Sequence, residues 1–297
     1  MGGTLSRPDP SRMPVVIGAG YSRTGTSSMQ LALERLVDGP VYHGGTQTWL
    51  SGDDARVKLW GQACDAKFVA RDKELTMKLV REAVKGYAGL VDAPAIWLLP
   101  EILEICPDAQ VVLNTRDPER WWKSFENLFN HVPLAYFTVL TAVRPGIRWI
   151  PRSCGGTSYL RRDCCAMPAA IPVSMDRVRY PTLPTSSREM VRSTDRAQVI
   201  LELYQQHVID IVPKDKLLIM DLKEGWEPMA SFLEKDVPKE QFPRVNESAV
   251  FDKQAKSLFR MLVLTWAGVL AATGGSAYLV WSLAGPVRKW VFSHVGA

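Results

Sequence analysis

The sequence predicts an α/β protein whose central parallel sheet is flanked by helices. Short apolar runs typical of buried strands alternate along the chain with stretches in which apolar residues recur at helical spacing. The first apolar run ends in glycines, and a helical pattern follows this turn directly. Hydrophobic residues make up 46% of the chain and charged residues 23%, which is enough apolar surface for a sizeable core. This alternation indicates helices packed on a parallel sheet.

Each element of this fold has its own signal in the sequence. Continuous apolar runs predict strands over residues 13–20, 89–92, 110–115 and 217–221. Apolar residues at helical spacing predict helices over residues 28–37, 72–87, 95–106, 119–131, 194–211 and 228–233. Prolines and arginines interrupt the pattern over residues 133–190, where we expect an insertion or lid on the substrate side. One folded domain is therefore expected at residues 14–250, after a flexible leader at residues 1–13.

Charge and cysteine content exclude several classes of function. The formal net charge is +5, and the basic residues are interspersed with acidic ones, so we expect no nucleic-acid binding. The five cysteines lack the paired spacing of a zinc site and the density of a disulfide scaffold. We therefore expect reduced thiols and no bound metal. A small ligand that carries phosphate fits this composition better.

The C-terminal part of the chain predicts a membrane anchor. No charged residue lies between Arg260 and Arg288, and a helix rising about 1.5 Å per residue crosses the hydrocarbon core with about 20 residues. We therefore expect a transmembrane helix at residues 258–286 and a short tail at residues 287–297, with the folded domain in the cytosol because no secretory signal precedes it. The start of the chain also matches the N-myristoylation pattern at Gly2, and the alternative is a disordered polar leader.

A glycine-containing loop at residues 18–28 predicts a phosphate site between the first strand and the first helix. Amide groups and the helix dipole attract anions at such a position. The dinucleotide fingerprint G-x-G-x-x-G would need glycine where Arg23 stands. An ATP-type P-loop matches Gly20 and Gly25 but finds Thr26 where its lysine belongs. We therefore expect a phosphate ligand that is neither a typical dinucleotide nor ATP.

In this loop Arg23 stands two positions before Gly25, and Thr26 and Ser27 follow the glycine. This pattern resembles the 5′-phosphosulfate loop of sulfotransferases that use 3′-phosphoadenosine 5′-phosphosulfate (PAPS). Such enzymes bind the 3′-phosphate with an arginine at a strand end and a serine in the next helix, and Arg116 and Ser124 have this spacing. The resemblance covers about residues 14–250, is greatest to a subgroup common in fungi, and implies a three-layer P-loop fold with PAPS as donor. The donor-binding residues that it implies are Arg23, Thr24, Gly25, Thr26, Ser27, Ser28, Arg116 and Ser124.

The resemblance also implies a transfer mechanism with named catalytic residues. Sulfuryl transfer develops negative charge, which Arg23 and the loop amides would stabilise. The acceptor hydroxyl needs a base, and His43 is our first candidate because histidine exchanges protons near neutral pH. Asp92, at the end of the strand over residues 89–92, is the second candidate, as a base or as an orienting partner. A structural histidine and a turn-capping aspartate are the alternatives for these two positions.

The apolar run at residues 134–143 and the expected anchor favour a lipophilic small-molecule acceptor with a hydroxyl group. Two other functions are alternatives. A membrane adaptor would bind a nucleotide in the loop without catalysis. An NAD-dependent epimerase or dehydratase fits less well, because the sequence lacks the Tyr-x-x-x-Lys pair that such catalysis usually uses.

Overall fold

The computed structural model describes residues 5–130, 194–245 and 259–276, and also residues 148, 256–257, 278, 282 and 284. The chain forms two compact units, Met1–Phe251 and Asp252–Ala297. The expected insertion lies outside the described residues except for Arg148, and the expected tail lies outside them entirely.

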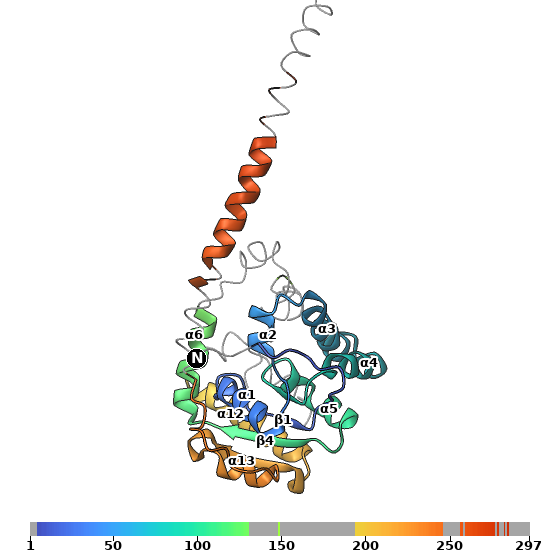
Figure 1. The fold of residues 1–297 in the computed structure, drawn as a ribbon, viewed down its shortest axis with the longest axis vertical. Helices are drawn as coiled ribbons and strands as arrows, with labels where there is room; N and C mark the ends of the chain where they lie inside the picture. Colours follow the sequence, from blue (N-terminus) through green and yellow to red (C-terminus); the bar gives the residue numbers. More distant parts are fainter. Residues whose placement is uncertain are drawn as a thin grey trace, which may run out of the picture. The chain divides into compact units, whose positions relative to one another are not determined.

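The first unit contains a sheet of five parallel strands in the order β2-β3-β1-β4-β5, of which β1 and β4 are labelled in Figure 1. These strands are β1 (Val16–Gly18), β2 (Val41–His43), β3 (Gly89–Val91), β4 (Gln110–Thr115) and β5 (Leu217–Asp221). The first strand is central, since Ile17 pairs with Leu90 of β3 and with Val111 of β4. This arrangement confirms the predicted parallel sheet and places the end of β1 between two neighbouring strand ends.

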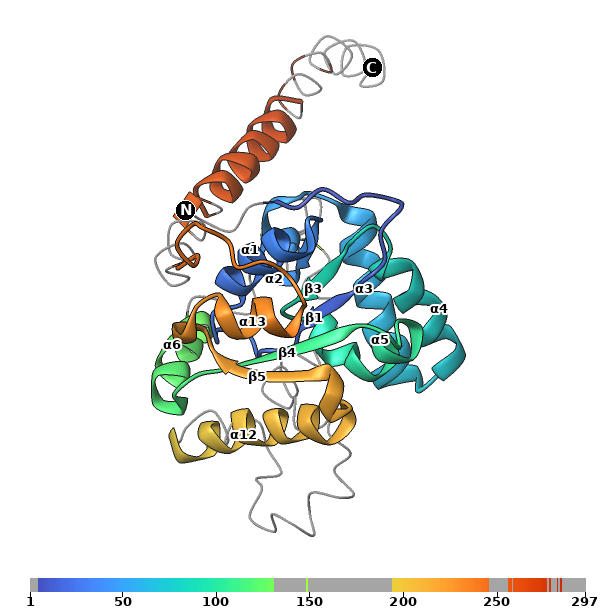
Figure 2. The same ribbon diagram turned by 60° about the horizontal axis from the view of Figure 1, so that its bottom comes forward.

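Helices connect the strands in chain order. The described α-helices of this unit are α1 (Thr26–Val37), α2 (Gly44–Leu50), α3 (Asp54–Asp65), α4 (Lys73–Val84), α5 (Leu99–Ile105), α6 (Pro118–Asn130), α12 (Thr194–Ile211) and α13 (Glu227–Phe232). Short turns of other helix types are η1 (Ala66–Ala70), η2 (Ala95–Leu98), η6 (Lys214–Lys216) and η7 (Leu222–Glu224). Figure 2 shows α1 and α13 on one side of the sheet and α12 on the other.

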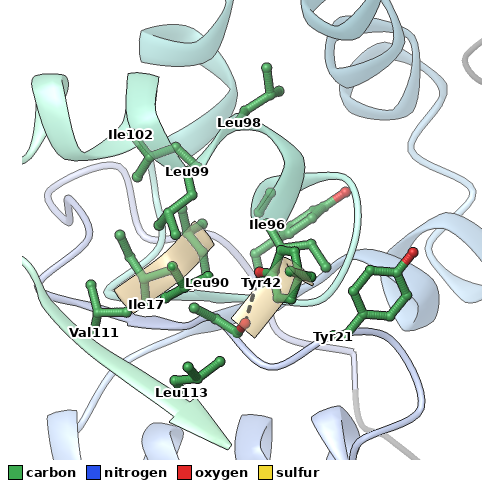
Figure 3. Close-up of a cluster of buried hydrophobic side chains, with 14 of the residues drawn as sticks. Ile17, Tyr21, Tyr42, Leu90, Ile96, Leu98, Leu99, Ile102, Val111 and Leu113 are labelled. Atoms are coloured by element: carbon green, nitrogen blue, oxygen red, sulfur yellow. Dashed lines mark hydrogen bonds between the residues drawn. The ribbon is translucent and has the colours of Figure 1, made fainter. Parts of the chain in front are cut away.

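Neighbouring residues of each strand enter different cores because side chains alternate between the two faces of a sheet. Ile17 belongs to one buried cluster, which α3, α4, α5, α6 and α12 complete, whereas Val16 belongs to a second cluster with α1 and α13. Figure 3 shows Leu99 and Ile102 of α5 close to strand residues of the first cluster. Fully burying such a side chain contributes about 1.5–3 kcal/mol, so both faces of the sheet stabilise a three-layer fold.

The sequence patterns did not reveal the elements between α1 and α4. The strand β2 has three residues, too few for a periodic signal. The helix α3 has an N-capping aspartate, a residue type that often marks a helix start in a sequence. In the structure the Asp53 side chain accepts a hydrogen bond from Arg56 N at 3.0 Å. Its buried residues include Val57, Trp60 and Cys64, which recur at helical spacing. The strand β2 and the helix α2 matter for function because they form one side of the candidate site.

Part of the expected leader lies along the first unit. Val41 N donates to Ser6 Oγ at 3.0 Å, beside the outer strand β2. Asp9 N donates to Gly86 O at 2.8 Å, and Gly86 N donates to Arg12 O at 3.0 Å. The segment therefore supplies a hydrogen-bond partner to the edge strand β2, where strand groups would otherwise face solvent, and further partners to the turn before β3.

The second unit contains a helix at residues 259–276. The predicted transmembrane helix at residues 258–286 is not confirmed, because no helix within the described ranges is both long and apolar enough to cross a membrane. The charge of Arg260 and the small residues Gly274 and Gly275 lower the hydropathy of the described stretch.

Candidate functional site

The loop between β1 and α1 lies beyond the carboxyl end of the central strand, where α/β proteins bind their ligands. Its backbone takes left-handed angles at Arg23 (φ 73°) and Gly25 (φ 104°). Gly25 is the N-cap of α1 and contributes no side-chain cap. A side chain there would also collide with Leu222, because an added Cβ would lie 2.5 Å from Leu222 Cδ1. The loop thus presents a helix N-terminus, which attracts anions through its amides and dipole.

The end of β4 holds the loop through main-chain carbonyl groups. Asn114 Nδ2 donates to Thr24 O at 2.9 Å and to Thr24 Oγ1 at 2.8 Å. Arg116 Nη1 donates to Arg23 O at 2.6 Å. Asn114 is 1% exposed, and Gly20 packs so closely against it that an added Cβ would lie 1.9 Å from Asn114 Oδ1. Gly20 is therefore required by close approach.

The residues expected to bind the 3′-phosphate lie directly beside the loop. Ser124 of α6 is buried, and its Oγ accepts a hydrogen bond from Arg23 Nε at 3.2 Å. The Arg116 guanidinium donates to the carbonyl oxygen of Arg23. The fold thus brings Arg23 next to Arg116 and Ser124, which lie 93 and 101 positions further along the chain.

Two aromatic side chains hold further carbonyl groups of the loop. Trp121 Nε1 donates to Ser22 O at 2.9 Å, and the Tyr204 hydroxyl donates to Ala19 O at 2.8 Å. Burial raises the pKa of Tyr204 well above its ordinary value, and Tyr21 adds to this effect. The phenol therefore stays protonated and keeps donating at neutral pH.

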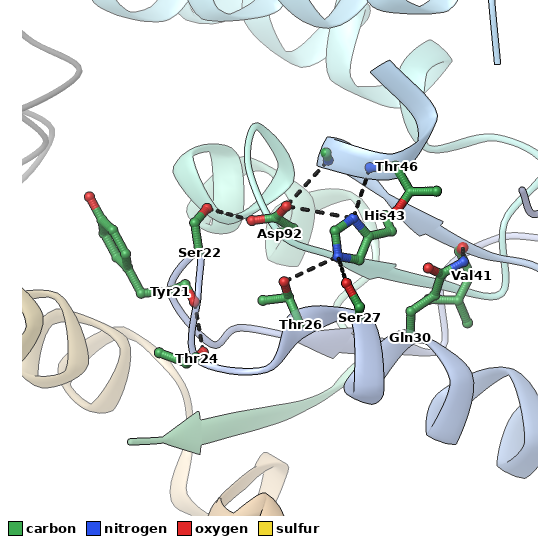
Figure 4. Close-up of polar contacts among 11 residues, drawn as sticks. Tyr21, Ser22, Thr24, Thr26, Ser27, Gln30, Val41, His43, Thr46 and Asp92 are labelled. Carbon is green, nitrogen blue, oxygen red and sulfur yellow. Dashed lines mark hydrogen bonds and ion pairs between the residues drawn. The ribbon is translucent and has the colours of Figure 1, made fainter. Parts of the chain in front are cut away.

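His43 and Asp92 lie together on the opposite side of the loop, at the ends of β2 and β3 (Figure 4). Both are buried, at 5% and 8% exposure, and His43 Nδ1 lies 3.6 Å from Asp92 Oδ2. His43 Nε2 lies 3.1 Å from Thr26 Oγ1 and 3.3 Å from Ser27 Oγ. Asp92 accepts a hydrogen bond from Ser22 Oγ. Both expected catalytic side chains therefore contact the loop.

Helix α2 begins at this histidine. Thr46 N donates to His43 Nδ1 at 3.1 Å, so the imidazole is the N-cap of the helix. Gly45 N donates to Asp92 Oδ2 at 3.2 Å. Asp92 has φ 67°, a left-handed angle that aspartate tolerates better than most residues. The structure therefore fixes both side chains through backbone groups of α2.

Ser28, which we expected to bind the sulfuryl donor, makes a different contact in this structure. The Ser28 hydroxyl is buried and accepts a hydrogen bond from Val245 N at 2.9 Å, in the segment after α13. Ser28 thus joins α1 to a later segment of the unit, and its contact with the donor stays a prediction.

Sequence reasoning missed several residues that contact the loop, among them Trp121, Tyr204, Asn114 and Ser22. Asn114 had a signal, because an amide stands at the end of an otherwise apolar strand run. Ser22 had none, since its partner Asp92 is distant in sequence. Among the residues that the structure describes, no group of three or more His, Cys, Asp or Glu side chains is placed to hold a metal ion.

The fold and the site define an α/β protein in which a loop and the N-terminus of α1 lie at the end of the central strand. A model of the sulfotransferase domain matches residues 15–251, which is most of the chain. The chain therefore belongs to the sulfotransferase family, as its sequence motifs predicted.

Two known proteins resemble this chain. The Ava biosynthesis cluster protein M of Aspergillus versicolor is 30% identical over 238 residues, which cover 77% of this chain and 80% of the relative. A crystal structure of a sulfotransferase from Alicyclobacillus acidocaldarius is 15% identical, with a TM-score of 0.35, and the match covers 84% of this chain and 95% of that one.

Proposed function

We propose that the protein transfers a sulfuryl group from PAPS to the hydroxyl group of a small molecule. The observation that carries this proposal is the convergence of Arg23, Arg116 and Ser124 beside the loop. Two guanidinium groups and a hydroxyl in one cluster suit a nucleotide with phosphate at two positions, because arginine binds phosphate through charge-assisted hydrogen bonds.

In the proposed reaction the acceptor oxygen forms a bond to sulfur while the bond from sulfur to the bridging oxygen of the 5′-phosphate breaks. The acceptor proton passes to a base, and 3′-phosphoadenosine 5′-phosphate (PAP) leaves. Negative charge develops on the bridging oxygen, so positive groups close to it lower the barrier. Arg23 and the N-terminus of α1 would supply that positive charge.

Asp92 is the better candidate for the base. A base must offer an unoccupied lone pair to the acceptor proton. Both ring nitrogens of His43 have partners, Thr46 N at Nδ1 and hydroxyl groups at Nε2. A carboxylate has about four acceptor positions. Ser22 Oγ and Gly45 N occupy two of those of Asp92.

A small-molecule acceptor is favoured by the relative from Aspergillus versicolor, which is named as a biosynthesis cluster protein. Exposed apolar side chains at Phe259, Leu264 and Leu270 support a further proposal, that the second unit holds the protein at a membrane and the acceptor is lipophilic. Cytosolic orientation and myristoylation at Gly2 stay predictions. Deletion from residue 256 should move the protein to the supernatant in membrane fractionation, and an unchanged pellet fraction would contradict the attachment.

Calorimetric titration with PAP and with adenosine 5′-phosphate tests the donor assignment. Arg116→Ala should weaken PAP binding at least about tenfold, because it removes a charged hydrogen-bond donor. Arg120→Ala is the matched control, since Arg120 is exposed on α6 and should leave affinity unchanged. Equal affinity of the wild type for both nucleotides would contradict the proposal, and PAP binding without PAPS turnover would favour the non-catalytic adaptor.

A further inference from the structure

The hydrogen bonds of His43 decide which of its ring nitrogens carries the proton. A backbone N–H can only donate, and Thr46 N lies 3.1 Å from His43 Nδ1. Nδ1 therefore offers its lone pair to the start of α2 and carries no hydrogen. Since a neutral imidazole has one N–H group, that hydrogen is on Nε2.

The Nε2–H group faces the first turn of α1. Thr26 Oγ1 lies 3.1 Å and Ser27 Oγ 3.3 Å from His43 Nε2. A nitrogen that carries hydrogen cannot accept a hydroxyl proton, so the two oxygens are acceptors toward the ring. Their own protons must then be directed to other acceptors. Both hydroxyl groups lie at the N-terminal end of α1, which Gly25 caps, and a helix N-terminus attracts anions. A phosphate oxygen is therefore a suitable acceptor for the hydroxyl protons.

Asp92 does not change this tautomer. The gap of 3.6 Å between its Oδ2 and His43 Nδ1 is too long for a hydrogen bond. Its two oxygens instead accept from Ser22 Oγ and from Gly45 N. Asp92 and His43 thus contact the two ends of the loop, one before Arg23 and the other after it.

We propose that His43 is a positioning residue which, as the neutral Nε2–H tautomer, orients the hydroxyl groups of Thr26 and Ser27 toward the phosphate of the donor. This inference rests on the proposed function, and it assigns His43 a function other than proton acceptance. In the observed arrangement neither ring nitrogen has a lone pair for an acceptor hydroxyl. Loss of the contact should therefore weaken nucleotide binding, whereas loss of a base would leave it intact.

Two amide substitutions separate the two contacts of the ring. In His43→Asn the amide oxygen can still accept from Thr46 N, because asparagine is a good N-cap, but the shorter side chain does not reach α1. In His43→Gln the longer side chain can place an N–H group near the position of Nε2. Neither amide is a general base, so a change in PAP affinity that differs between the variants reports the contact with the loop.

Calorimetric titration of the full chain with PAP should show affinity about tenfold weaker for His43→Asn and within about threefold of wild type for His43→Gln. Thermal unfolding of each variant checks that the fold is kept. Unchanged PAP affinity in both variants would overturn the proposal in favour of a base or a simple helix cap. Equal weakening in both would also overturn it, because the effect would then follow general disturbance of the site.

A second measurement needs no nucleotide and no variant. The ¹⁵N chemical shifts of the His43 ring at neutral pH should show hydrogen on Nε2 and an unprotonated Nδ1, and hydrogen on Nδ1 would overturn the inference. Failure of the wild type to discriminate PAP from adenosine 5′-phosphate would instead contradict the proposed donor. The two failures are therefore distinguishable.

Discussion

The two sides of the loop after β1 are held by different kinds of contact. On the β4 side, Asn114 and Arg116 donate to main-chain carbonyl groups. On the side of β2 and β3, His43 and Asp92 contact side-chain hydroxyl groups. Apart from the bond from Asn114 Nδ2 to Thr24 Oγ1, the first set of contacts depends on the path of the backbone, whereas the second depends on which side chains the loop carries.

The two sets of contacts therefore determine different properties of the loop, its conformation and the chemistry of its side chains. Carbonyl groups held from one side turn the amides of the same peptides toward the other side, because each peptide unit is planar. The β4 contacts therefore determine the conformation of the anion site. The contacts from β2 and β3 determine where hydroxyl protons and carboxylate lone pairs lie. We expect substitutions on the first side to change stability and binding together, and those on the second to change binding or turnover at nearly constant stability.

The largest effect should follow Asp92→Asn, which removes the proposed base. Turnover should fall about 10²–10⁴-fold while PAP affinity stays within about threefold, because a general base acts on the acceptor. Release of PAP from PAPS with a panel of phenols and alcohols measures turnover. Asp53→Asn is the control, since Asp53 caps α3 away from the loop. Near-normal turnover of Asp92→Asn would place the base elsewhere.

Gly20→Ala should break the β4 side by steric collision. Its Cβ would lie 1.9 Å from Asn114 Oδ1 and 2.4 Å from Asn114 Cγ. Overpacking of this kind costs about 1–3 kcal/mol or more, so we expect a loss near the top of that range in urea unfolding, with PAP binding lost as well. Gly268→Ala serves as control, because an added Cβ there has no neighbour within 4 Å. Equal stability of the two variants would contradict the close approach.

Asn114→Ala should have a smaller effect on the same side. It removes two hydrogen bonds to Thr24 from a buried amide, which should lower the free energy of unfolding by about 2 kcal/mol. Gln110→Ala, on the same strand, removes one partly buried bond to Phe232 O and should cost less. Urea unfolding compares the two, and the reverse ranking would show that Asn114 does not support the loop.

The smallest effect should follow Tyr204→Phe, which removes the bond to Ala19 O and should cost about 1 kcal/mol at neutral pH. The raised pKa of the buried phenol adds a pH dependence. Above the ordinary tyrosine pKa of 10.0 the unfolded chain loses a proton that the folded protein keeps, so stability falls as pH rises.

In Tyr204→Phe this fall should be shallower but not absent, because burial also raises the pKa of Tyr42 and Tyr87. Urea unfolding at neutral pH and above the ordinary tyrosine pKa measures the difference. An unchanged slope would mean that Tyr204 ionises equally in both states.

The sequence alone determined the order of most strands and helices and the position of the candidate loop between β1 and α1. Local patterns carry this information, since apolar periodicity reflects which face of an element is buried. It also determined the family, because the residues around Arg23 and Arg116 form motifs that can be read in order along the chain. The short strand β2 was not predicted, since three residues show no period. The helix α3 was also missed, although its buried residues recur at helical spacing.

Only the tertiary structure decided which groups the candidate site residues contact. Asn114 reaches Thr24 across 90 positions of sequence, and Ser22 reaches Asp92 across 70. Such pairs leave no local pattern, because strand order in the sheet brings them together. The sequence identified His43 as an ionisable side chain near the loop, but the donor that occupies its Nδ1 comes from α2, a helix the sequence patterns did not reveal. The physical reason is that a hydrogen bond depends on positions in space, which follow from packing of the whole unit.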